Sequence, residues 1–275
     1  MPPGNLFTLA RQCLESTDPQ AKCELSERAF RSLEDGLIGF EKVDGADEVQ
    51  PIGVPGRPPR PRLVAPRELP RRQPGSPAGR AALVHALAHI EFNAINLAWD
   101  AVYRFRELPH DFHRDWARVA FEEAYHFRLL CQRLEVLGYR YGDFDAHDGL
   151  WEMARRTAHD PLVRMALVPR VLEARGLDVT PGLMERLAKA GEQPLVDVLE
   201  IILRDEIGHV EIGTRWFRYL CEQRGLDADT TFAALVREYM KGRVKRPFHY
   251  DARRAAGFNA REMEDLEMLA GDGGR

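Results

Sequence analysis

The stretch Glu122-Glu123-Ala124-Tyr125-His126 recurs later in the chain as Asp205-Glu206-Ile207-Gly208-His209. Each copy follows an upstream glutamate at nearly the same interval, since Glu91 lies 32 residues before Glu123 and Glu173 lies 33 residues before Glu206. Residues three apart share one helical face, so each Glu-x-x-His places a carboxylate beside an imidazole. Two such helices, with one Glu from each of two others, supply the ligands of a di-iron or di-manganese site in a four-helix bundle.

These acids and imidazoles interrupt apolar helical stripes. The apolar neighbours are Leu87, Ala88, Ile95 and Ala98 around Glu91, Val119, Ala120, Phe127 and Leu130 around Glu123, and Ile202, Leu203, Val210 and Gly213 around Glu206. An unpaired ionised carboxylate on such a face is costly, whereas two divalent cations would neutralise four of them. The alternative is ordinary surface acids with two packed histidines. A single Glu-x-x-His motif would favour that alternative. Two such motifs, each with an upstream glutamate at nearly the same interval and on an apolar face, favour a metal site.

The ligand types indicate which metal the site holds. Carboxylate and imidazole without thiolate are typical of iron or manganese rather than structural zinc, so we predict two iron ions, with manganese as the alternative. Glu123 and Glu206 are the predicted bridging carboxylates, and each histidine supplies one nitrogen. The complete predicted ligand set is Glu91, Glu123, His126, Glu173, Glu206 and His209.

Glu122 competes with Glu123 as the ligand because it lies four residues before His126. The second copy favours Glu123, since the intervals of 32 and 33 residues are counted to the second acid of each pair. Glu122 and Asp205 are then predicted to accept a hydrogen bond from the other ring N–H of a ligand histidine, or to be solvated acids. Tyr125 lies inside the first motif and could be a hydrogen-bonding or redox neighbour, although it is expected to point toward an adjacent helix.

Other candidate residues carry weaker signals. His85 and His89 are four residues apart, but no acid or thiol spacing supports a metal there, so a surface or packing role is expected. Three tryptophans at 99, 151 and 216 are expected in the core rather than as electron relays. The arginines of residues 57–72 could contact phosphates, yet a Pro/Arg segment is usually a solvated strap.

The composition is that of an ordinary globular protein. The 275 residues carry a net charge of -4, which gives no global case for binding nucleic acid or membranes. The N-terminal residues lack the pattern of a signal peptide, and no apolar run is long enough to span a bilayer. Four cysteines without metal or disulfide spacing favour a reducing compartment. We therefore expect a cytoplasmic protein.

The helical periodicity predicts an all-α chain with four segments. Residues 1–50 form an N-terminal helical extension and residues 51–76 a Pro/Arg-rich strap. Residues 77–225 form a four-helix bundle and residues 226–275 pack on it as C-terminal helices. Ser76-Pro77 and Asp160-Pro161 are typical helix starts. Gly176 and Pro181 predict a break in the helix that carries Glu173.

The chain resembles the ferritin-like superfamily in its duplicated Glu and (Glu,Asp)-Glu-x-x-His pattern, which rubrerythrins and tRNA-modifying di-iron hydroxylases share. More closely, it looks like a bacterial ferritin-like family of unassigned function. The residues that carry this resemblance are His89 to Phe92, Leu97 to Asp100, Arg204 to Val210 and the strap from Pro55 to Pro61. The resemblance covers most of residues 50–260 and implies a di-iron bundle rather than a particular substrate.

The leading functional hypothesis is an oxidoreductase that activates O2 or peroxide, most simply an oxygenase or hydroxylase, with an unknown substrate and electron donor. Iron storage is the second hypothesis, although the strap and terminal helices make the chain larger than a storage cage needs, and a monomer or dimer is expected. A tRNA-modifying hydroxylase is the third, suggested by the Arg-rich strap. The last alternative is a helical scaffold with a vestigial site.

Overall fold

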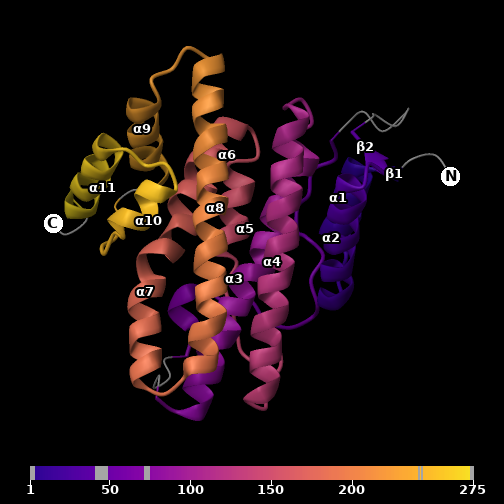
Figure 1. Cartoon of the computed structure of the whole chain (residues 1–275), viewed down its shortest axis with the longest axis vertical. Coiled ribbons are helices and arrows are strands. Elements are labelled where there is room, and N and C mark those ends of the chain that lie inside the picture. Colours follow the sequence, from indigo (N-terminus) through magenta and orange to yellow (C-terminus); the bar gives the residue numbers. More distant parts are fainter. Residues whose placement is uncertain (1–3, 41–48, 71–74, 241, 243, 273–275) are drawn as a thin grey trace. The chain divides into compact units, whose positions relative to one another are not determined.

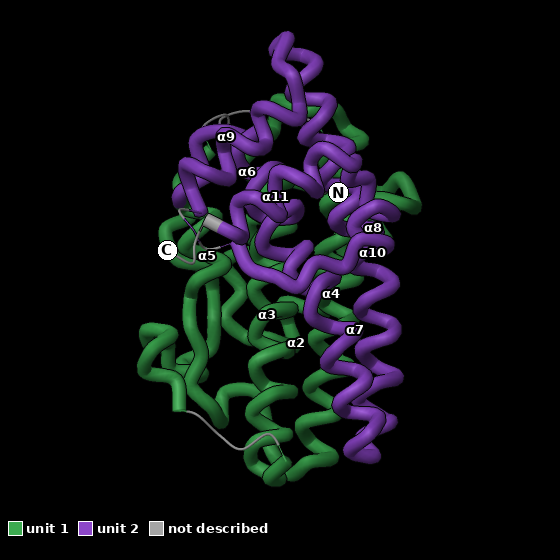
Figure 2. Tube along the Cα trace, turned by 90° about the vertical axis from the view of Figure 1, so that its left-hand side faces the viewer, with its two compact units in different colours: residues 1–155 green, residues 156–275 purple. Residues whose placement is uncertain are grey.

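The computed structural model describes residues 4–40, 49–70, 75–240, 242 and 244–272, and within them the predicted all-α fold class is confirmed. The strand pair among these residues joins two-residue strands, β1 (Gly4–Asn5) and β2 (Ile38–Gly39), in parallel. The chain divides into two compact units, residues 1–155 and 156–275 (Figure 2). Part of the predicted strap (71–74) and two residues of the predicted C-terminal segment (241 and 243) lie outside the described residues.

The first unit is built on a long helical hairpin (Figure 1). Its helices are α1 (Leu6–Glu15), α2 (Pro19–Glu34), α3 (Pro77–Arg104), α4 (His110–Val136) and most of α5 (Gly149–Arg156). Helix α3 packs against α4, while α1 packs on α3 and α2 packs on α4. The predicted helix start is confirmed, because the Ser76 side chain accepts a hydrogen bond from the Gly79 N–H and Pro77 occupies the first turn.

Helix α3 is buried on all sides from residue 91 to residue 103. Polar side chains within this stretch therefore need partners inside the unit. The Lys22 ammonium of α2 donates to Asn96 Oδ1 at 2.7 Å and to the Cys13 carbonyl in the last turn of α1 at 2.6 Å. The Trp99 indole N–H donates to Ser26 Oγ at 2.8 Å. These polar contacts tie the N-terminal extension to the helix that carries Glu91.

Residues 51–70, the described part of the predicted strap before its gap, are extended with one 3₁₀ turn, η1 (Pro66–Glu68). The Gly56 N–H donates to the carbonyl of Leu14, and Val64 and Ala146 are joined by a backbone hydrogen bond of 2.9 Å. The Trp151 indole donates to the Gly53 carbonyl at 3.0 Å. Over its described residues, the extended segment forms no regular helix or sheet of its own. Its backbone N–H and C=O groups instead make hydrogen bonds to neighbouring elements of the unit.

The second unit is centred on a 31-residue helix, α8. Its elements are α6 (Pro161–Leu167), the π-helix η2 (Val168–Glu173), α7 (Ala174–Lys189), α8 (Gln193–Gln223), α9 (Ala228–Met240), α10 (Tyr250–Ala255) and α11 (Ala260–Asp272). Helix α8 packs against α6, η2, α7, α9 and α10. Asp160 caps α6 as predicted, since its carboxylate accepts from the Leu162 N–H at 2.8 Å.

The predicted break at Gly176 and Pro181 is wrong. Helix α7 continues through both residues, so Pro181 removes one backbone hydrogen bond without ending the helix. The irregularity lies earlier, where η2 forms a wide π turn around Pro169 and ends at Glu173. The ring of Pro169 lies against α8, since a Cβ added at Gly213 would come within 2.3 Å of its Cγ. The short helix α10 was not predicted.

The tryptophans, the cysteines and the hydropathy of the helices bear on the remaining predictions. Trp99, Trp151 and Trp216 are buried, as predicted. The cysteines at 13, 23, 131 and 221 are free thiols. Among the helices that the structure describes, none has an apolar stretch long enough to cross a lipid bilayer.

Candidate metal centre

The first unit brings together three of the predicted ligands, which we call the first ligand cluster: Glu91 of α3 with Glu123 and His126 of α4. The His126 Nδ1 lies 3.4 Å from Glu91 Oε2 and 3.5 Å from Glu123 Oε2. One ligand atom from each residue lies within 4.8 Å of the others, and all three side chains are buried. Two carboxylates and an imidazole that converge in this way could hold a metal ion.

The electrostatics of the first ligand cluster favour a cation. Burial, together with the neighbouring Glu123 carboxylate, raises the pKa of Glu91 above its ordinary value. Glu91 Oε2 is buried and makes no hydrogen bond to any residue that the structure describes. A divalent ion would stabilise the ionised carboxylates, whereas a proton must neutralise one of them otherwise. The residues therefore fit the predicted metal.

The second unit contains the other three predicted ligands, Glu173, Glu206 and His209, which we call the second ligand cluster. The His209 Nδ1 lies 3.6 Å from Glu206 Oε1 on the same face of α8. Glu173 ends η2, which packs against α8. His209 is buried, whereas the Glu206 side chain is 13% exposed and Glu173 is partly buried. Glu206 Oε2 makes no hydrogen bond to the described part of the chain.

The apolar stripes predicted around the ligands lie in the core. Ten of the twelve predicted neighbours are buried, and the remaining two, Leu87 and Leu203, are partly buried. The regular helices α3, α4 and α8 therefore present their ligand residues to the interior at the spacing that the sequence predicts.

The acids beside the ligands lie nearer the surface. Glu122 lies 3.6 Å from Arg118 Nε, and Asp205 lies 2.9 Å from Arg204 Nε. Their side chains are 27% and 18% exposed. Tyr125 is 41% exposed, so it points away from the buried face that holds its neighbour His126. The roles predicted for these three residues remain predictions.

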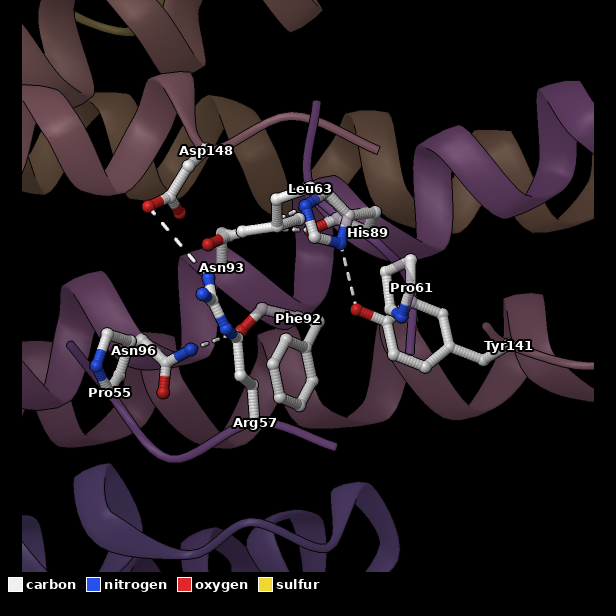
Figure 3. A pocket seen from close by; sticks show the side chains of 10 residues that line it. All are labelled: Pro55, Arg57, Pro61, Leu63, His89, Phe92, Asn93, Asn96, Tyr141 and Asp148. Carbon is white, nitrogen blue, oxygen red and sulfur yellow. Dashed lines mark hydrogen bonds and ion pairs between the residues drawn. The ribbon is translucent and has the colours of Figure 1, made fainter. Parts of the chain in front are cut away.

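The two histidines at 85 and 89 are packing residues, as predicted. His85 Nε2 accepts from the Gly142 N–H at 2.9 Å, and His89 Nδ1 lies 2.8 Å from the Tyr141 hydroxyl (Figure 3). Burial lowers the pKa of His89 to about 4, so the ring is neutral. The cavity beside it, under the strap, is about 10 Å³, which is room for about one water molecule. It is therefore too small for an organic substrate.

Arg170 was missed by the sequence analysis, although it holds the turn that carries Glu173. Its guanidinium donates to the buried Glu262 carboxylate of α11 and, through Nε, to Thr214 Oγ1 of α8 at 3.2 Å. The aromatic rings of Phe217, Phe232 and Phe258 lie within 4.7, 4.0 and 4.6 Å of it. No local signal could have identified this contact, because its two partners are 92 residues apart.

Comparison of the sequence with known proteins finds similarity to a family of unknown function. Residues 15–264 match the family model described as "Protein of unknown function (DUF455)". An uncharacterized protein of Haemophilus influenzae is 46% identical over 258 residues, which cover 91% of this chain and 90% of that protein. The search of solved structures found no match.

Proposed function

The chain belongs to the protein family of unknown function DUF455, and from that premise we propose that it is an oxidoreductase that uses two metal ions to activate O2 or peroxide. Iron is the proposed metal and manganese the alternative. An oxygenase or hydroxylase that acts on a small or apolar substrate is the first proposed form of the activity. Reduction of peroxide is the second.

The first ligand cluster is the observation that carries this proposal. Two buried carboxylates and an imidazole meet within 4.8 Å, and one carboxylate oxygen there makes no hydrogen bond within the described chain. Native proteins rarely retain such a group unless it binds something. The second ligand cluster repeats the same residue types at the same spacing, and we propose the ligand set of six residues for two ions that the sequence predicts.

Each side chain then has a distinct task. Glu123 and Glu206 would be the bridging carboxylates, Glu91 and Glu173 would each hold one ion, and His126 and His209 would each give one nitrogen. Nδ1 of both histidines faces a carboxylate in its own cluster, so Nδ1 is the proposed metal ligand. Glu122 and Asp205 are proposed to accept from the Nε2–H of the histidines, which would fix the ring orientation. When bound, a pair of such ions supplies the electrons for reducing O2 or peroxide.

The test begins with metal content. Purified protein is loaded with Fe(II) without oxygen, washed and analysed for metal, and then mixed with O2 while its consumption is recorded. Two ions per chain and rapid O2 consumption would support the proposal, and fewer than two ions would contradict it. Glu211, an exposed acid on the same helix as Glu206, provides the matched control, Glu211→Gln.

The rival functions predict different results in companion measurements. A large hollow oligomer in a size measurement would favour iron storage over an enzyme. Co-purified RNA, or an altered nucleoside profile in a deletion strain, would favour a tRNA-modifying hydroxylase. The strap gives little structural support to that rival, because Arg62 pairs with Asp145 at 2.7 Å and Arg57 lies 3.9 Å from Asp148.

A further inference from the structure

A cavity of about 350 Å³ lies in the second unit against η2, the turn that ends in Glu173. This volume falls within the size range of small-molecule pockets, about 300–1,000 Å³. Val171 and Leu172 of η2 form part of its wall, together with residues of α7, α9, α10 and α11. The metal-site hypothesis does not use this cavity.

The charged side chains that line the cavity are mostly basic: Arg170, Arg175, Lys245 and Arg253, against the single acid Asp178 among the described lining residues. That acid is already engaged, because Arg253 Nε and Nη2 donate to its two oxygens at 2.8 Å each. The His249 N–H donates to it as well, at 2.9 Å. The exposed Lys245 forms no ion pair with any residue that the structure describes. Arg170 is paired with Glu262, as Arg253 is with Asp178. The surplus of positive charge at the cavity therefore comes from Arg175 and Lys245.

Two of these guanidinium groups have an unused donor. Arg170 is fully buried and Arg253 is 3% exposed, yet Nη1 of each makes no hydrogen bond within the described chain. Phe258 lies 4.6 Å from the Arg170 guanidinium and 4.9 Å from that of Arg253, but an aromatic face supplies no oxygen acceptor. Buried N–H donors of this kind are normally satisfied by an acceptor, and an anionic ligand would supply one.

The rest of the lining is apolar. The residues are Val171, Leu172, Met240, Val244, Phe248 and Leu266. We propose that the cavity binds an organic carboxylate, with its anionic head at the arginines and its hydrocarbon body against this apolar wall. A planar carboxylate matches the fork of a guanidinium, and Lys245 attracts the anion from the exposed rim.

The same turn connects this ligand to the metal hypothesis. Arg170 precedes Glu173 by three residues, so a ligand in the cavity would lie against the turn that holds a proposed metal ligand. If the carboxylate is the substrate of the oxidoreductase, that role rests on the function proposed above. The binding of the carboxylate to the cavity is independent of that function.

The direct test is a calorimetric titration of the full chain with acetate, butanoate, hexanoate and inorganic phosphate. Metal-loaded and chelator-treated protein are titrated in parallel, so that binding to a metal ion is separated from binding to the cavity. We expect one site per chain in both preparations and an affinity that rises about fourfold per methylene. Phosphate should bind much more weakly than hexanoate, because it has no hydrocarbon body.

Variants then locate the site. Lys245→Glu should weaken hexanoate binding about tenfold, whereas Lys189→Glu, a charge reversal at an exposed lysine outside the cavity, should not change it. Both positions are exposed, so neither change is expected to disturb folding. The proposal is overturned by no saturable binding at about 10 mM, by phosphate binding as tightly as hexanoate, or by equal affinities of the two variants. Hexanoate binding without consumption of either O2 or peroxide would retain the cavity proposal and reject the oxidoreductase.

Discussion

The two ligand clusters use the same residue types at the same spacing, but the backbone that presents them differs. Glu91 lies in the middle of a regular helix whose residues 91–103 are all buried. Glu173 lies at the end of a π turn that contains Pro169, and it is partly buried. Insertions of this kind in helices frequently mark functional sites. The first cluster is therefore a fixed, dry half, and the second is a half whose ligand position depends on an irregular turn.

For the proposed activity, this difference would give the two clusters different tasks. A ligand on a long buried helix cannot move without disturbing the core, because protein interiors are close-packed. The start of the π turn is held by Pro169 and Arg170, whereas Glu173 at its end is only partly buried and is therefore less constrained. We therefore expect the second cluster to adjust during the reaction and to admit the substrate, while the first cluster retains its metal more tightly.

The largest expected effect is the loss of metal and activity on neutralising a bridging carboxylate. Glu123→Gln should lower metal affinity by at least about 100-fold and abolish O2 consumption, since a neutral amide is a poor ligand. Glu206→Gln should lower it less, because water can reach a side chain that is 13% exposed. Metal analysis and O2 uptake measure both, with Glu211→Gln as the control. Unchanged metal content and O2 consumption in both variants would contradict their assignment as metal ligands.

The next effect concerns the ion pair that holds the irregular turn. Glu262→Gln leaves the buried charge of Arg170 uncompensated and should lower the free energy of unfolding by about 3–5 kcal/mol. Glu264→Gln, at an exposed position on the same helix, should change it by less than about 0.5 kcal/mol. Urea unfolding of the three proteins provides the comparison. An equal stability of all three would show that the pair does not hold the turn.

A smaller effect is expected where the π turn meets α8. Gly213→Ala places a methyl group 2.3 Å from Pro169 Cγ and should cost about 1–3 kcal/mol of stability. Gly182→Ala, in helix α7 of the same unit, meets only the end of the Arg186 side chain at 3.7 Å and should gain about 0.5–1 kcal/mol. Thermal unfolding distinguishes the two. A neutral Gly213→Ala would mean that the turn shifts freely, contrary to the contact described.

The last effect is a pH dependence of stability, and it concerns the unit that holds the first ligand cluster. Burial lowers the pKa of Lys22 to about 7 from its ordinary value of 10.5, although Cys13 and Cys23 partly oppose the shift. Between these values the unfolded chain binds the proton and the folded chain does not, so stability rises with pH there. Below about pH 7 Lys22 is protonated in both states, and the full cost of burying its charge lowers the stability. Lys22→Met should remove up to about 1.4 kcal/mol per pH unit from that slope.

The control for this pH dependence is Lys189→Met, which changes an exposed lysine of the second unit. Urea unfolding at several pH values gives the slope for each protein. Identical slopes in the parent, Lys22→Met and Lys189→Met proteins would show that Lys22 keeps an ordinary pKa in the folded chain.

The sequence predicted the regular parts of this molecule because helical periodicity and capping act locally. Ser76-Pro77 and Asp160-Pro161 start helices where they were expected. The ligand faces could also be predicted, since a three-residue spacing on an apolar stripe defines one face. The π turn could not, because a proline in a helical pattern does not show on which side the irregularity will lie. Gly176 and Pro181 were misleading for this reason.

Long-range polar contacts were also beyond prediction. Lys22 and Asn96 are 74 residues apart, and Arg170 and Glu262 are 92 residues apart. Nothing in the local sequence around either pair indicates the partner. Such contacts depend on the tertiary fold, and they are what hold the elements that carry the proposed ligands.

The most direct test of the central claim is the anomalous scattering of crystals of the full chain grown with iron, recorded on both sides of the iron absorption edge. We expect two iron peaks per chain, each coordinated by carboxylates and by one histidine, His126 for one ion and His209 for the other. A single peak, or two peaks away from these histidines, would contradict it.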